Sequence, residues 1–208
     1  MSLFLCRIPL ILASSSPRRI ALLGELGLPF TVCPAPDEVD PFPGEAAGDY
    51  ALRAAEAKAA CVRKLRAAET GGARAAILAA DTVVSVDKDI FGKPDSPREA
   101  LAMLKRLNGR SHDVITACCL LRPDGSSKRY AKDSFAVTSR VEFWDCPEPL
   151  LIAYARGEEP LDKAGAYAAQ GVGAFLTRSL SGSWSNVVGL PMSEVVERLL
   201  SRNIIAVA

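Results

Sequence analysis

The sequence predicts a mixed α/β protein, in which helices pack on a sheet of parallel and antiparallel strands. In the first half of the chain, apolar strand-like runs alternate with segments of helical periodicity, an order typical of α/β proteins. Farther along, the strand-like segments 112–122 and 128–141 are joined by Pro123-Asp124-Gly125, a hairpin signal that requires antiparallel pairing. Because both kinds of connection occur, we expect a mixed sheet rather than a doubly wound parallel one.

The expected elements follow one another without an internal repeat. Apolar runs and turn signals predict strands at 10–13, 28–33, 75–86, 112–122, 128–141 and 174–177. Helical periodicity, opened by serine or proline and closed by glycine or asparagine, predicts helices at 17–27, 49–69, 97–108, 147–157 and 191–200. The polar or proline-rich connections are expected to be loops and turns at 34–48, 86–90, 158–173 and 181–186.

The composition is typical of a globular chain without a strong overall field. The chain has 208 residues, of which 49% are hydrophobic and 24% charged, and its formal net charge is +1. We therefore expect no nucleic-acid or membrane partner, and any anion must be held by a local site. No signal peptide or bilayer-spanning run is evident, and the six cysteines show no CxxC spacing. These features predict reduced thiols in a cytoplasmic protein.

A candidate anion site lies where the first expected strand meets the first helix. Three serines at 14–16 end the apolar run, Ser16 can cap the helix, and Pro17 fits its first position. Arg18 and Arg19 then fall in the first turn, where the helix dipole disfavours cations. A phosphate group bound there would remove the conflict, although two solvated surface arginines explain the pattern equally well.

Asp81 is the sharpest candidate for chemistry, because it interrupts the apolar run 75–86. A carboxylate in a buried strand is costly unless it is paired, protonated, metal-bound or placed where the sheet opens into a cleft. A structural aspartate satisfied by backbone N–H groups is the plainer alternative. We favour a functional role, since perturbed acids cluster at active sites.

Further candidates are two lysines, an acidic loop and one amide. Lys58 shares a helical stripe with alanines and either extends to solvent or reaches inward to a charge. Lys93, in a Gly-Lys-Pro segment, points at a ligand or completes a plain turn. The acids of 157–171 are suited to a divalent cation or to solvent, and Gln170 has room for a two-way amide contact. The single histidine, His112, has no hydrolase motif beside it.

Four blocks of the sequence, taken together, resemble the Maf family of nucleoside triphosphate pyrophosphatases. Their order and spacing carry the resemblance, from Leu10 to about Leu200, and they are residues 13–19, 80–82 with 92–94, 157–171, and 186–191. The resemblance implies one domain over 1–208, with a long mixed sheet flanked by helices. It also implies two lobes around a central cleft, similar to inosine triphosphate pyrophosphatases. The implied activity is metal-dependent hydrolysis of dTTP and UTP, and of modified pyrimidine nucleotides, to the monophosphate and pyrophosphate.

The resemblance also implies roles for single residues. Asp81 matches the family's proton acceptor, and Arg18, Thr82 and Gln170 match the substrate-sorting positions of the dTTP/UTP subgroup. The positions implied to line the phosphate pocket are Ser14, Arg19, Lys58, Lys93 and Lys163. Asp81 and Glu38 are implied to lie beside a Mg²⁺ or Mn²⁺ ion. The acidic segment departs from the family pattern, so that Asp37 and Asp40 stay open as alternatives to Glu38.

Other interpretations remain beside this one. A nucleotide-binding regulator of cell division with little turnover is the main alternative, and a pyrophosphatase of modified purine nucleotides is another. The sequence shows no tail, coiled coil or extended apolar patch that a division partner would need. A small nucleotide is the expected partner, and the resemblance is compatible with a homodimer, which no sequence feature supports.

Overall fold

The computed structural model describes residues 3–36, 39–68, 74–125 and 129–208. Its strands are β1 (Phe4–Cys6), β2 (Leu10–Leu12), β3 (Phe30–Val32), β4 (Ala76–Val86), β5 (Asp89–Phe91), β6 (Ser111–Pro123), β7 (Tyr130–Phe143), β8 (Thr177–Ser181) and β9 (Ile205–Val207). Its α-helices are α1 (Pro17–Gly24), α2 (Ala47–Ala68), α3 (Pro97–Leu107), α4 (Glu148–Ala155), α5 (Trp184–Val188) and α6 (Met192–Ser201). Three short 3₁₀ turns complete the described chain: η1 (Glu159–Asp162), η2 (Ala164–Ala166) and η3 (Val172–Leu176).

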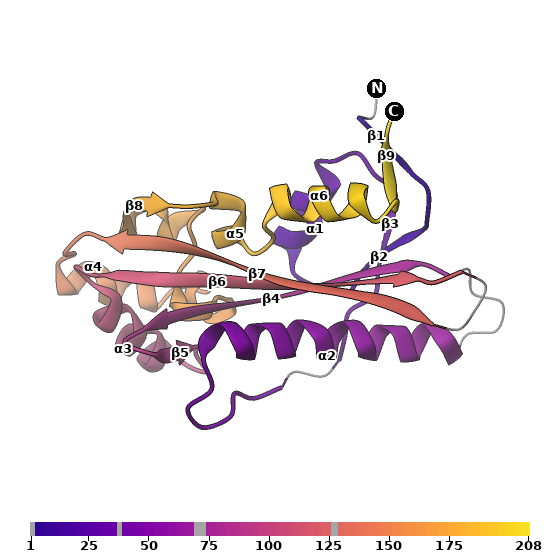
Figure 1. Ribbon diagram of the computed structural model, residues 1–208. Helices are drawn as coiled ribbons and strands as arrows, with labels where there is room; N and C mark the ends of the chain where they lie inside the picture. The colour runs from indigo at the N-terminus through magenta and orange to yellow at the C-terminus, as the bar shows by residue number, and fades with distance from the viewer. Residues whose placement is uncertain (1–2, 37–38, 69–73, 126–128) are drawn as a thin grey trace.

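The expected mixed sheet is confirmed. Seven strands form the main sheet in the order β3-β2-β4-β6-β7-β8, with β5 paired to β4 alone. β2 runs parallel to β3 and β4, whereas the other neighbours are antiparallel. Helix α2 lies along one face of the long strands, and α1 and α6 lie on the opposite face (Figure 1). β1 and β9 form a separate two-stranded sheet.

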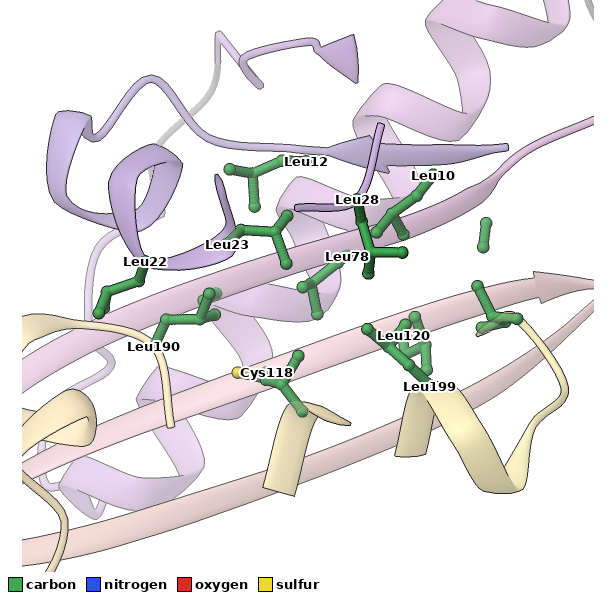
Figure 2. Close-up of a cluster of buried hydrophobic side chains, with 14 of the residues drawn as sticks. Leu10, Leu12, Leu22, Leu23, Leu28, Leu78, Cys118, Leu120, Leu190 and Leu199 are labelled. Atoms are coloured by element: carbon green, nitrogen blue, oxygen red, sulfur yellow. The ribbon is translucent and has the colours of Figure 1, made fainter. Parts of the chain in front are cut away.

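The two faces of β4 are assigned by the alternation of its side chains. Ala76, Leu78 and Ala80 pack with α1 and α6, in the cluster drawn in Figure 2. Ile77 and Ala79 point the other way and pack against the alanine stripe of α2. The small alanine side chains allow α2 to lie close to the sheet, so that a longer side chain from this helix can reach β4.

One edge of β4 is only partly covered, and this gap positions the site. β6 pairs with β4 along 77–85, whereas the other edge is shared by two short strands. β2 covers 76–78 and β5 covers 84–86. Between them, the segment 79–83 has no strand on that edge within the described part of the chain, and the sheet opens there.

Several local predictions need correction. The strand expected at 174–177 is wrong, because η3 occupies Val172–Leu176 and β8 begins only at Thr177. The expected turn 181–186 contains the start of α5. Ser16 occupies the N-cap position of α1 but makes no side-chain capping bond; instead, the Ser14 hydroxyl accepts the Ser16 N–H at 3.2 Å. β1, β5 and β9 were not expected, and the predicted helix end at 69–72 lies outside the described residues.

Candidate functional site

A cavity of about 730 Å³ opens over the uncovered edge of β4. This volume is within the range of small-molecule sites. Residues of both faces of the sheet reach it, because the strand that would separate them is missing at this point. Among its lining residues are the sequence candidates Ser14, Arg18, Arg19, Lys58, Asp81, Thr82, Lys93, Lys163 and Gln170. Glu38 and Asp37 lie outside the described residues, whereas Asp40 lines the cavity.

Asp81 continues the row of β4 side chains that faces α2, and it meets Lys58 there. The Lys58 Nζ donates to Asp81 Oδ1 at 2.5 Å, and the two side chains are 15% and 13% exposed. Burial of a charge is tolerated when an opposite charge compensates it, which explains how an apolar strand carries this carboxylate. Of the two orientations open for Lys58 from the sequence, the structure has the inward one.

Thr82 continues the opposite row and belongs to a cluster around Arg19. The Arg19 guanidinium donates to the carbonyl oxygens of Gly189 at 2.7 Å and Ala80 at 2.8 Å. It also donates to the hydroxyls of Thr82 at 2.9 Å and Ser14 at 3.4 Å. Four protein acceptors therefore use most of the donors that a guanidinium offers. Burial lowers the pKa of Arg19, and the nearby Asp81 carboxylate opposes that shift.

Arg18 is held much more loosely than its neighbour. Its Nη1 lies 3.4 Å from the Asp162 carboxylate, and the Arg18 side chain is 23% exposed. Asp162 also pairs with Lys163. Arg18 and Lys163 thus share one carboxylate among the residues that line the cavity, and an anionic ligand would compete with that carboxylate for them.

The loop that carries Lys163 and Gln170 is fixed at defined points. The Gly165 N–H donates to the Gly92 carbonyl at 3.0 Å, which ties the loop to the end of β5. Gly165 has a φ of +69°, and a Cβ there would lie 2.9 Å from the Val84 side chain, so that no larger residue fits without strain. Gln170 itself is exposed and lies along the cavity.

Glu159 fastens the two ends of the same loop. Its carboxylate accepts the Tyr154 hydroxyl at 2.8 Å and the N–H groups of Gly173 at 2.7 Å and Val172 at 3.1 Å. Burial alone would raise the pKa of Glu159, but these hydrogen bonds outweigh it and lower the pKa below 4.5. From the sequence alone, Glu159 is only one of several acids in this loop, because its hydrogen-bond partners lie in separate segments.

The described residues of the cavity include carboxylates, but they do not form a preformed cage for a metal. Asp40, Asp81, Asp95 and Asp162 line it. Within the described ranges, no group of three or more His, Cys, Asp or Glu side chains is arranged to hold a metal ion. Mg²⁺ typically uses one or two carboxylates together with substrate phosphates, so this donor set fits it better than a metal that needs a protein cage.

His112 and the cysteines, the other residues noted in the sequence, behave differently from the cavity residues. His112 does not line the cavity, and the cysteines form no disulfide. His112 is buried against Tyr167 and Phe143 and does not line the cavity. All six cysteines are free, as expected, but only Cys118, Cys119 and Cys146 are fully buried. No helix in the described part of the chain combines the length and the apolar character needed to cross a membrane.

Comparison with known proteins gives a consistent result. The family model described as Maf-like protein matches residues 9–202. A dTTP/UTP pyrophosphatase of Nitratidesulfovibrio vulgaris is 50% identical over 198 residues, which cover 95% of this chain and 89% of that protein. The dTTP/UTP pyrophosphatase of Oleidesulfovibrio alaskensis is 44% identical, with 97% of this chain and 89% of that protein covered.

A third relative and a solved structure complete the comparison. The dTTP/UTP pyrophosphatase of Desulfotalea psychrophila is 42% identical, with 99% of this chain and 100% of that protein covered. Among solved structures, the Ham1 protein of Staphylococcus aureus matches with a TM-score of 0.40 and 16% identity. That match covers 65% of this chain and 71% of the Ham1 chain, and it is too distant to support an argument.

Proposed function

Because the chain belongs to the Maf-like protein family, we propose that it is a nucleoside triphosphate pyrophosphatase that acts on dTTP and UTP. The observation that carries the proposal is the single cavity in which cationic side chains surround the buried carboxylate of Asp81. Cations attract a polyphosphate, and a fixed carboxylate can take a proton from water. A triphosphate is the ligand that uses both features at once.

Cationic side chains would hold the phosphates. Lys58, Lys93 and Lys163 line the cavity together with Arg19, which also donates to the Thr82 hydroxyl. Preorganised cations also stabilise the negative charge that develops on a departing pyrophosphate. Since most donors of Arg19 bind protein acceptors, we assign Arg19 to holding the Thr82 hydroxyl and to the positive potential of the cavity.

Asp81 would act on the attacking water. Lys58 holds Oδ1, so Oδ2 is the oxygen that we assign to accept a proton from water. The water oxygen forms a bond to the α-phosphorus while the bond to the bridging oxygen of the β-phosphate breaks. The products are the nucleoside monophosphate and pyrophosphate, and the carboxyl proton then passes to solvent.

A divalent cation fits the carboxylates of the cavity. We assign Asp40 or the sequence candidate Glu38 to hold the ion beside Asp81, whose free oxygen acts on the water. Mg²⁺ or Mn²⁺, bound there with the substrate phosphates, would supply charge neutralisation of the phosphate oxygens.

Base selection is assigned to the part of the cavity that Gln170, Arg18 and Thr82 line. The Gln170 amide carries one acceptor and two donors, which suit the edge of uracil or thymine. Arg18 and Thr82 would shape the same part. The substrate would then be a free nucleotide in the cytoplasm, where the six free thiols of this chain stay reduced.

A panel of nucleoside triphosphates tests the proposal. The purified chain is incubated with each canonical triphosphate, with and without Mg²⁺ or Mn²⁺, and pyrophosphate and monophosphate are measured. Metal-dependent release of pyrophosphate from dTTP and UTP is the expected result. Tight nucleotide binding without turnover would instead favour the regulator, and a preference for purine nucleotides would overturn the base assignment.

A further inference from the structure

We propose that Thr116 and Asn186 are positioning residues that hold the Thr82 hydroxyl as a hydrogen-bond acceptor toward the cavity. The proposal deepens the proposed function, on which it rests, by naming what this end of the pocket selects. A fixed acceptor favours a ring N–H donor, as in uracil and thymine, over the ring-nitrogen acceptor of cytosine. Neither residue lines the cavity, and both act through Thr82.

A short relay of hydrogen bonds leads away from the cavity through the sheet. Thr82 on β4 and Thr116 on β6 are directly paired across the two strands, and their hydroxyl oxygens lie 2.9 Å apart. The Thr116 hydroxyl lies 2.8 Å from the Asn186 carbonyl oxygen in α5. The relay thus joins Thr82, the candidate specificity residue, to the sequence block 186–191 through contacts that only the folded chain creates.

The chemistry of the groups fixes the direction of each hydrogen bond. A carbonyl oxygen can only accept, so the single hydrogen of Thr116 points to Asn186. Thr116 must then accept from Thr82, which commits the only hydrogen of Thr82 to the relay. Arg19 donates to the same Thr82 oxygen at 2.9 Å and uses one lone pair. The Thr82 oxygen therefore has one lone pair left, which can accept a hydrogen bond but cannot donate one.

The far end of the relay is buried and anchored. Thr116 and Asn186 are both 0% exposed. The Asn186 side-chain amide donates to the Val114 carbonyl at 3.1 Å and to the Ser139 hydroxyl at 2.9 Å. These two hydrogen bonds hold α5 against the sheet. They therefore also fix the Asn186 backbone carbonyl, which accepts the hydrogen bond from Thr116.

The ligand then meets a hydroxyl of fixed polarity. Uracil and thymine present an N–H at ring position 3, whereas cytosine presents a bare nitrogen there. A hydroxyl that is free to rotate would serve both bases, because it can donate or accept. Because the hydrogen of Thr82 is bound to Thr116, the Thr82 hydroxyl can no longer donate to a base. With cytosine, the Thr82 lone pair would face the lone pair of the ring nitrogen, and neither group would have a hydrogen-bond partner.

Substitutions at Thr116 separate this role from simple packing. Thr116→Val keeps the shape but removes the acceptor, so the Thr82 hydroxyl is released to donate. Thr116→Ser retains the hydroxyl and is the conservative rescue. Thr138→Val is the matched control, since Thr138 is an exposed residue on the adjacent strand β7. For each chain, kcat/KM is measured with UTP and with CTP, and thermal unfolding checks the fold.

The expected result is a loss of base discrimination without a general loss of activity. The ratio of kcat/KM for UTP to that for CTP should fall about 3- to 10-fold in Thr116→Val, the worth of about one neutral hydrogen bond. Thr116→Ser and Thr138→Val should keep the wild-type ratio. An unchanged ratio in a folded Thr116→Val protein would overturn the proposal, as would an equal fall in Thr116→Ser.

Two further measurements keep the outcome decisive. If Thr116→Val does not fold, Thr116→Cys replaces it, because a thiol is a weaker acceptor and should lower the ratio partway. If the wild-type chain releases no pyrophosphate, the proposed function fails, and the relay is then judged by equilibrium binding of UTP and CTP. Equal binding of the two nucleotides by the wild-type chain would overturn the inference separately.

Discussion

Asp81 and Thr82 are neighbours on one strand, yet the polar clusters around them differ in kind. On the α2 face, Lys58 holds one carboxylate oxygen of Asp81. On the α1 face, Arg19 is bound by four protein acceptors, and Thr82 is bound on both sides. In the Asp81 cluster, Lys58 binds only one of the two carboxylate oxygens. In the Arg19 cluster, most of the guanidinium donors are already bound by protein acceptors. The contrast suits the proposed roles, in which Asp81 acts on water and the Arg19 cluster fixes geometry.

The largest loss of activity is expected from Asp81→Asn, a substitution on the α2 face of β4. The amide keeps the size of the side chain but cannot take a proton from water, so kcat with UTP should fall about 10²- to 10⁴-fold. Asp87→Asn is the matched control, since Asp87 follows the same strand and pairs with Arg110 outside the cavity. Normal turnover of Asp81→Asn, with a native circular dichroism spectrum, would contradict the assignment of the base.

The adjacent arginines give the second largest effect. Arg19→Lys cannot reproduce the planar fork and leaves buried acceptors unpaired, so the free energy of unfolding should fall by about 3 kcal/mol. Arg18→Lys loses one partly exposed contact, and its effect should stay within about 1 kcal/mol. Urea denaturation measures both. Equal losses would show that Arg19 is no more structural than Arg18.

The loop that lines the cavity with Lys163 and Gln170 should respond to Gly165→Ala. The added Cβ would meet Val84 at 2.9 Å in a backbone conformation with φ of +69°. We expect about 2 kcal/mol of destabilisation and a higher KM, because Lys163 lies two residues away. Gly48→Ala serves as the control, since nothing lies within 4 Å of its added Cβ. A thermal melt distinguishes the two variants.

The smallest effect concerns His112, a polar group that the sheet buries outside both clusters. Its Nε2 lies 2.8 Å from the Tyr167 hydroxyl, and burial lowers the pKa of His112 from 6.5 to about 4. The unfolded chain therefore binds more protons between these values, and stability falls as the pH drops below 6.5. From pH 7.5 to 5.5 the loss should be about 1 kcal/mol.

His112→Phe tests this dependence. The variant lacks the titrating ring, so its free energy of unfolding should change less over the same pH range, whatever its absolute stability. Urea denaturation at several pH values measures the two slopes. Identical slopes in the variant and the wild-type chain would exclude His112 as the source.

Features encoded within a few residues could be predicted from the sequence. Ser96 accepts the Glu99 N–H at 3.2 Å and caps α3 as expected, and the turn before β5 has positive φ at Asp87 and Lys88. Asp81 was found because a charge in an apolar run is visible in the sequence alone. The boundary of β8 was misplaced, since the pairing that defines it depends on β7.

Relations between distant segments could not be predicted in this way. Three of the four partners of Arg19 lie 61, 63 and 170 residues away in sequence, and Thr116 meets Asn186 across 70 residues. No periodicity records such contacts, because they arise only when β4, β6 and α5 are packed together. The sequence thus indicated candidate residues that the structure brings to one cavity, but it could not tell which of the cations is bound by protein acceptors.

The pairing of β1 with β9 has a practical consequence for protein engineering. Phe4 lies opposite Val207, and both ends of the described chain leave the molecule at one corner (Figure 1). A short glycine-serine linker can therefore connect them, and new ends can be opened at the exposed Asp87–Lys88 turn. Such a circular permutant keeps every strand pairing of the sheet while it moves the free ends to the turn between β4 and β5, two strands that both carry residues of the cavity.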